Sequence, residues 1–185
     1  MAFNRKLVEY TAFFSSLASP NEAVTAATIA AAYNLAARTA TPRTQFKIPA
    51  FPVNLKGPKI IATGLTSSFL ASRALPLGKI SQGIWLAAAR QVILYWTGVV
   101  FNPAVPPSTG GPPLGLPGGV NIVTFPGNQA KLALDLRNAF LEGSARQSSQ
   151  SLGRAFTNHL RSVKGQWVGT STAGTPLTVP WNGLK

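Results

Sequence analysis

The sequence predicts a mainly α-helical protein, with about five helices in one small domain, long extended arms rich in proline and glycine, and little or no sheet. Three observations support this fold class. The chain has 185 residues, of which 45% are hydrophobic, enough for one core. Apolar side chains recur at helical spacing in several segments. The 15 prolines and 17 glycines concentrate between those segments. We therefore treat residues 1–185 as a single domain.

The first predicted helix begins at a capping pattern and ends near Thr39, before Pro42. Ser19 suits the N-cap, Pro20 the first helical position, and Glu22 the third. Two apolar stripes follow, one with Val24 and Leu35, the other with Ile29 and Tyr33. The first 20 residues contain no apolar run that ends in a cleavage site, so we expect no secretory signal. A transit peptide stays open, because residues 1–40 are poor in acids.

Residues 41–64 predict an extended arm, since four prolines interrupt any helical period. Cations alternate there with apolar side chains, and no acid intervenes. One interpretation is a surface loop. The other is an arm that lies on a partner, with aromatic side chains in pockets and cations against acidic groups. The residues concerned are the cations Arg43, Lys47, Lys56 and Lys59 and the aromatics Phe46 and Phe51.

Two helices are predicted next, over residues 67–75 and 77–97. The longest apolar stretch, residues 84–101, falls largely in the second of these and carries Arg90 and Gln91 near its middle. A charge at the centre of a bilayer is costly, and 18 residues is a short span. We therefore expect a buried or interface helix here, with membrane contact as the less favoured alternative.

The second half of the chain predicts an uncharged loop, a helical hairpin and a tail. Residues 102–127 are dominated by proline and glycine, with one possible short strand at Val120–Phe125. Residues 128–165 predict the hairpin, with helices over 129–142 and 145–163 and Ser144 as a cap. Residues 166–185 predict an extended tail bearing Trp167 and Trp181. The expected core comprises Val24, Leu35, Ile84, Trp85, Val92, Leu132, Leu136, Phe140, Leu152, Phe156 and Leu160.

The charge balance is strongly basic: 17 Lys and Arg stand against 4 Asp and Glu, a formal net charge of +13. No acid follows Glu142. Solvated faces usually mix both signs, so we favour contact with phosphate or with an acidic protein face over an ordinary surface. The cations concerned are Arg146, Arg154, Arg161 and Lys164, together with Arg43, Lys47, Lys56 and Lys59. The expected interface anchors are Phe46, Phe51, Trp167 and Trp181.

The residue inventory argues against catalysis. Cysteine is absent, histidine occurs once, at His159, and no phosphate-loop motif is present. A Ser-His-Asp triad would require His159 and Asp135 to meet across the predicted hairpin. We therefore expect no catalytic residues, no metal and no cofactor.

These observations favour a non-enzymatic structural subunit of a large assembly, a virus or phage particle. Such a minor capsid, cement or connector-type protein would bridge neighbouring subunits in the virion, with its cations facing nucleic acid or acidic neighbours. A monomer is not the expected functional state. The alternatives are a basic protein of a cytoplasmic or organellar RNA–protein machine such as a ribosome, and a membrane-associated particle protein.

Overall fold

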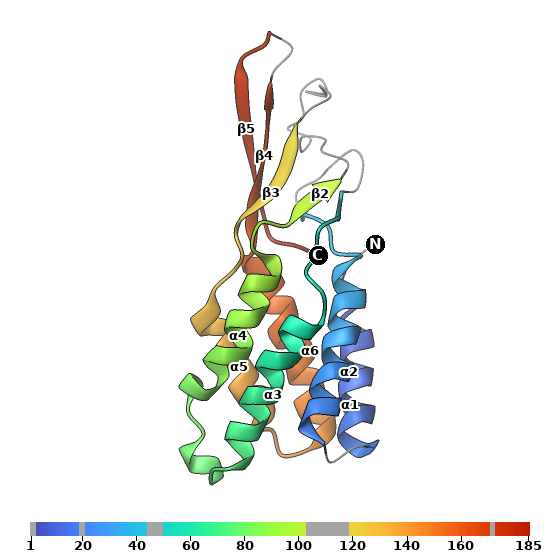
Figure 1. Ribbon diagram of the computed structural model, residues 1–185, viewed down its shortest axis with the longest axis vertical. Coiled ribbons are helices and arrows are strands. Elements are labelled where there is room, and N and C mark those ends of the chain that lie inside the picture. Colours follow the sequence, from blue (N-terminus) through green and yellow to red (C-terminus); the bar gives the residue numbers. More distant parts are fainter. Residues whose placement is uncertain (1–2, 19–20, 44–49, 103–118, 171–172) are drawn as a thin grey trace.

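The computed structural model describes residues 3–18, 21–43, 50–102, 119–170 and 173–185, and it combines a helical bundle with a sheet at one end (Figure 1). The helices are α1 (Arg5–Ala18), α2 (Glu22–Ala37), α3 (Lys59–Arg73), α4 (Gln82–Trp96), α5 (Gln129–Phe140) and α6 (Ala145–Ser162), with a 3-10 turn η1 (Leu77–Lys79). The strands are β1 (Phe51–Pro52), β2 (Val100–Asn102), β3 (Val120–Phe125), β4 (Lys164–Thr170) and β5 (Pro176–Asn182).

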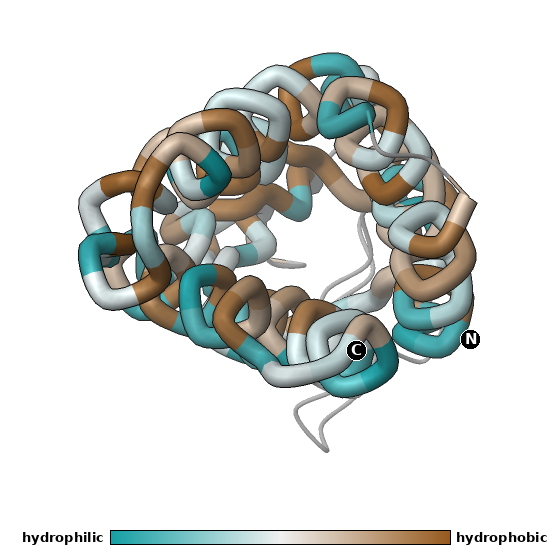
Figure 2. The backbone as a smooth tube through the Cα atoms, turned by 90° about the horizontal axis from the view of Figure 1, so that it is seen from below, coloured by the Kyte–Doolittle hydropathy of each residue, from teal (hydrophilic) through white to brown (hydrophobic). Residues whose placement is uncertain are grey.

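The helices form a closed ring. Each packs against the next in chain order, and α6 returns to contact α1. Figure 2 shows this ring from the end opposite the sheet, which we call the base. The other end, where the helices join the strands, we call the waist. The chain passes through the waist from the bundle to the sheet end after α2, α4 and α6, and it comes back into the bundle before α3 and α5.

Aromatic side chains fill the ring and are joined by hydrogen bonds. Tyr33 of α2 contacts Phe156 of α6, with ring centroids 4.6 Å apart, and Tyr95 of α4, at 5.6 Å. The indole Nε1–H of Trp96 donates to the Tyr33 hydroxyl at 2.7 Å. These buried polar atoms are therefore paired, and burial raises the pKa of the Tyr33 phenol far above its usual range.

The prediction of little or no sheet is wrong. The five strands form one antiparallel sheet in the order β1-β2-β3-β4-β5, although helices still dominate the structure. The predicted strand at Val120–Phe125 is confirmed as β3, and it is a central strand. The expected free tail is a hairpin instead: β4 pairs with both β3 and β5, and Lys185 exchanges two backbone hydrogen bonds with Thr41.

Two tryptophans and the glycines beneath them explain why this tail forms strands. Trp181 on β5 lies over Gly165 on β4, where any Cβ would stand 2.1 Å from the indole. Trp167 covers Gly169, two residues further along its own strand, and Gly119, which directly precedes β3. Trp181 and Gly165 form a cross-strand pair, which helical periodicity cannot reveal.

The helix predictions need four further corrections. Helix α1 was not expected at all. Helix α3 begins at Lys59, inside the predicted arm, so that the arm 41–64 is in part helical. The expected helix 77–97 is broken between η1 and α4. The cap of α2 is the side chain of Asn21, which accepts from the backbone N–H groups of Ala23 and Val24, whereas Ser19 and Pro20 lie outside the described residues.

The core prediction is largely confirmed, except on α2. Of the eleven expected residues, Val24 and Leu35 are exposed, at 51% and 57%, while Ile84 and Phe140 are half-buried. The other seven are buried. Helix α2 is apolar on nearly every side, so its sequence does not show which apolar stripe is buried. The ring buries the stripe with Ile29 and Tyr33.

Candidate functional site

The waist gathers cations from segments far apart in the sequence, because most chain crossings between helices and strands occur there. Several helix ends and connections contribute an exposed Lys or Arg. The cations at or next to the waist are Arg5, Lys6, Arg38, Arg43, Lys56, Lys59, Lys131, Arg161, Lys164 and Lys185. Adjacent cations of this kind produce a positive potential that attracts polyanions.

The acids do little to offset this charge at the waist. Glu9 is buried and paired with Arg5 at 2.8 Å and Lys6 at 2.9 Å. Asp135 pairs with Lys131 at 3.1 Å. The other two acids, Glu22 and Glu142, lie toward the base, where Glu22 pairs with Arg73. The remaining waist cations have no carboxylate partner among the described side chains.

The structure brings together predicted cations from both predicted basic segments. Arg43 donates its backbone N–H to the Gly183 carbonyl at 2.8 Å, and its side chain lies against Gly183. A Cβ on Gly183 would be 2.8 Å from Arg43 Cδ and 3.1 Å from the Arg161 carbonyl oxygen. Lys164 follows directly, opposite Asn182 in the sheet. Arg43, Arg161 and Lys164 are thus three exposed cations whose backbones meet at Asn182 and Gly183, and we call them the rear cluster.

A second group surrounds a polar pocket of about 330 Å³ between the C-terminal part of α2 and residues 52–58, which connect β1 to the start of α3. Arg38 and Lys56 line it together with Asn34, and Lys59 follows on the first turn of α3. The Asn34 amide oxygen accepts from the Tyr95 hydroxyl at 2.9 Å, which leaves the amide N–H₂ for a ligand. We call Arg38, Lys56 and Lys59 the pocket cluster. Sequence reasoning missed Arg38; its position in the last turn of the predicted helix was the available signal.

The remaining predicted contact residues do not join these clusters. Arg146 lies in the first turn of α6 at the base, about 22 Å along the helix from Arg161, and Arg154 lies between them. The expected basic face of α6 is thus spread along the helix. Lys47 and Phe46 lie outside the described residues.

The predicted aromatic anchors are mostly inside the chain. Trp167 and Trp181 are 0% and 1% exposed, and the Trp181 Nε1–H donates to the Asn121 side-chain oxygen at 2.6 Å. They pack the sheet, so the structure does not present them to a neighbour. Phe51 is half-buried on β1.

His159 and Asp135 come close but do not form a catalytic arrangement. Both line a very small cavity with Ser162. The Ser162 hydroxyl donates to the His159 backbone carbonyl, Asp135 pairs with Lys131, and neither His159 ring nitrogen has a hydrogen-bond partner in the described chain. Burial lowers the pKa of His159 to about 4, so the ring is a poor base.

The described residues show neither a metal-binding cluster nor a membrane-spanning helix, and the chain matches none of the known proteins it was compared with. Within the described residues, no three His, Asp or Glu side chains are placed to hold a metal ion, and no helix is long and apolar enough to cross a membrane. Comparison with protein-family models, curated proteins and solved structures finds nothing similar to this chain.

Proposed function

We propose that this chain is a non-enzymatic structural subunit of a virus or phage particle, and that it contacts the packaged nucleic acid through its waist. The observation that supports this most directly is the pair of clusters at the waist. Six exposed cations from four segments lie at one end of the bundle without a carboxylate partner among the described side chains. Phosphates of a nucleic-acid backbone would supply the missing negative charge.

The outer face of α1 and α2 supports the second part of the proposal, contact with neighbouring subunits. Five large apolar side chains lie exposed along this pair of helices, each more than half accessible: Tyr10, Phe14, Leu17, Val24 and Leu35. We call them the outer apolar face. A soluble monomer rarely exposes so many large apolar side chains together, whereas a subunit in a shell covers them.

At the β5 edge of the sheet, two prolines argue against strand addition by a neighbouring subunit. The backbone N–H of Gly183 donates to the Val163 carbonyl. Because backbone groups alternate along a strand, the N–H and C=O groups of odd-numbered residues of β5 point toward β4, and those of even-numbered residues point away from the sheet. Pro176 and Pro180 therefore stand on the open edge, where they offer no N–H. Prolines at this place protect a sheet edge from pairing. Helical contacts are accordingly the proposed mode of assembly.

Nucleic-acid binding is tested with two variants of equal charge. The first replaces the pocket cluster: Arg38→Gln, Lys56→Gln and Lys59→Gln. The second, a control away from the waist, combines Lys79→Gln, Arg90→Gln and Arg146→Gln. Affinity for a fluorescein-labelled 30-nucleotide single strand is measured by anisotropy from 50 to 300 mM salt. Each lost phosphate contact should reduce the slope of log K against log salt by about 0.7.

We expect the pocket variant to lose about 2 from this slope and the control variant much less. Equal losses in both would show that binding follows net charge alone and would overturn the assignment to the waist. If the unmodified chain does not bind at 50 mM salt, its cations do not face nucleic acid. If it also sediments as a monomer at tens of micromolar, with and without the oligonucleotide, the subunit proposal is wrong.

A further inference from the structure

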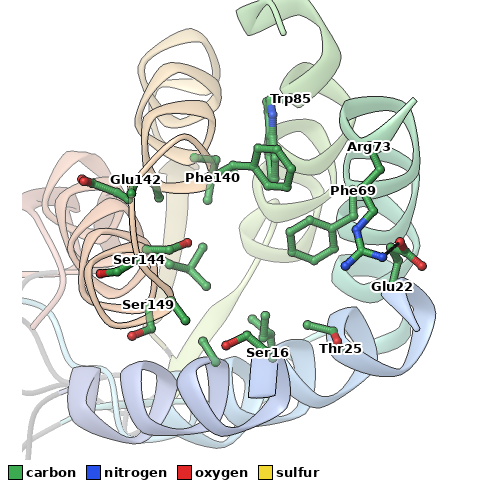
Figure 3. A pocket seen from close by; sticks show the side chains of 18 residues that line it. Ser16, Glu22, Thr25, Phe69, Arg73, Trp85, Phe140, Glu142, Ser144 and Ser149 are labelled. Carbon is green, nitrogen blue, oxygen red and sulfur yellow. Dashed lines mark ion pairs between the residues drawn. The ribbon is translucent and has the colours of Figure 1, made fainter. Parts of the chain in front are cut away.

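The ring of helices is open at its base, where it forms a pocket of about 340 Å³ (Figure 3). All six helices of the ring contribute to its lining, from Ala12 of α1 to Leu152 of α6. The pocket is thus the mouth of the ring interior, at the opposite end from the waist. Its volume lies within the range of small-molecule sites.

The wall of the pocket is aromatic. Phe69, Trp85 and Phe140 come from three successive helices and contact one another, with ring centroids 5.3 to 6.2 Å apart. Figure 3 shows the three rings on one side of the opening, across from Ser16 and Thr25 of α1 and α2. An aromatic ring inserted here would find edge and face contacts of the kind that aromatic pairs favour.

The charged side chains at the mouth, Glu22, Arg73 and Glu142, are either ion-paired or directed away from the aromatic wall. Arg73 is paired with Glu22. Glu142 accepts a hydrogen bond from Ser151 at 2.8 Å and turns its carboxylate away from the three rings in Figure 3. A charged group of a ligand that lies against the three rings would therefore gain no oppositely charged partner there. The hydroxyls of Thr25 and Ser148, which also line the pocket, have no hydrogen bond to another described residue.

We propose that the base pocket binds an uncharged, mainly aromatic small molecule that carries a single hydrogen-bonding group. The apolar body would lie against Phe69, Trp85 and Phe140, and its polar group would meet the wall hydroxyls. The base pocket is separate from the waist, so this proposal does not depend on whether the waist binds nucleic acid.

Three probes that share one ring system test the charge preference: 2-naphthol, 2-naphthoate and 2-naphthylmethylamine at pH 7. Isothermal titration calorimetry on the full chain measures each Kd. We expect 2-naphthol to bind at least tenfold more tightly than either charged probe, because the charged probes would have to lose water without gaining a partner. Tighter binding of the amine or the carboxylate, or no binding of any probe at 1 mM, overturns the proposal.

The location is tested with a filled pocket and a matched control. Ala139 is 2% exposed and lines the pocket, so Ala139→Phe should occupy it and weaken 2-naphthol binding at least tenfold. Ala71→Phe makes the same change at an exposed position of α3 and should leave the Kd unchanged. If Ala139→Phe binds 2-naphthol normally, or if it changes only the oligomeric state, the pocket does not take this ligand.

A measurement on the unmodified chain covers the case in which Ala139→Phe fails to fold. Alanine methyl groups are labelled with ¹³C, and 2-naphthol is titrated while their NMR shifts are followed. We expect shifts for Ala12, Ala139 and Ala145, which line the pocket, and none for Ala71 and Ala87, which are exposed elsewhere. The opposite pattern would place the ligand outside the pocket and refute the assignment.

Discussion

The bundle and the sheet are stabilised in different ways. In the bundle, buried side chains from six helices share one interior, so any one of them is a modest fraction of the whole. On the β4–β5 hairpin the buried strand residues are few: Gly165 and Trp167 on β4 and Trp181 on β5. A single substitution in the bundle core therefore removes a small part of its packing, whereas a single substitution on the hairpin removes a large part. The comparison teaches that the hairpin depends on individual residues to a degree that the bundle does not.

The largest expected effect is the loss of Trp181. Trp181→Ala would remove a fully buried ring and leave the Asn121 oxygen without its donor, so we expect a loss of about 3–5 kcal/mol in the free energy of unfolding. Urea denaturation followed by circular dichroism measures it. Trp181→Phe, which keeps most of the apolar contact, should lose less. If Trp181→Ala is as stable as the unmodified chain but fails to associate, the tryptophan is an interface anchor after all.

The bundle has a sensitive position of its own at His159. The folded chain holds the ring neutral, since burial lowers its pKa from 6.5 to about 4. The unfolded chain therefore binds more protons between these two values, and stability present above pH 6.5 is lost as the pH falls through about 4. This amounts to about 3 kcal/mol. Lys131 and Asp135 face the same small cavity from α5.

Denaturation at a series of pH values with His159→Leu checks this expectation. The variant should lack the part of the acid sensitivity that His159 contributes, so the difference in stability between the two chains should change steadily between pH 6.5 and 4. A difference that is constant with pH would mean that the ring is hydrated in the folded chain.

A smaller loss is expected when a glycine slot is filled. Gly165→Ala would put a methyl group against the Trp181 ring and 2.5 Å from the Ile122 carbonyl oxygen, which is backbone and cannot move aside freely. Overpacking of this kind costs about 1–3 kcal/mol. Gly78→Ala is the control, because a Cβ there meets nothing within 4 Å. Equal thermal stabilities of the two variants would mean that the slot is not required.

The same contrast explains what could be predicted from the sequence. Helices α5 and α6 carry clear apolar stripes. Gly143 marks the end of the first helix and Ser144 caps the second, and both helices lie close to the expected bounds. The sheet was missed because its pairs join residues far apart: Gly165 has meaning as a slot only once Trp181 is known to lie over it. The positions of the Lys and Arg residues could be read from the sequence. That Arg43 lies near Arg161 could not, because it depends on the C-terminal residues that run beside Thr41.

Helix α1 shows a further limit of sequence reasoning. Its buried side carries Val8, Glu9 and Ala12, and its exposed side carries Tyr10, Phe14 and Leu17, so apolarity points outward as much as inward. A carboxylate is an unexpected core residue, and Glu9 is buried because Arg5 and Lys6 neutralise it from the same helix. Such a pattern has no clear stripe, and neither the helix nor its orientation follows from spacing.

The smallest expected effect on stability is on the outer apolar face, where the change should appear in association instead. Phe14→Ser alters a ring that is 62% exposed, so the free energy of unfolding should stay within about 0.5 kcal/mol. Sedimentation velocity at tens of micromolar should then show fewer oligomers than the unmodified chain forms. Thr63→Ala, an equally local change at an exposed position of α3, is the control and should leave association unchanged. Oligomers that persist in Phe14→Ser with the same size distribution would direct the search for subunit contacts away from α1 and α2, because a face that tolerates a hydroxyl in place of a ring is covered by water and not by a neighbour.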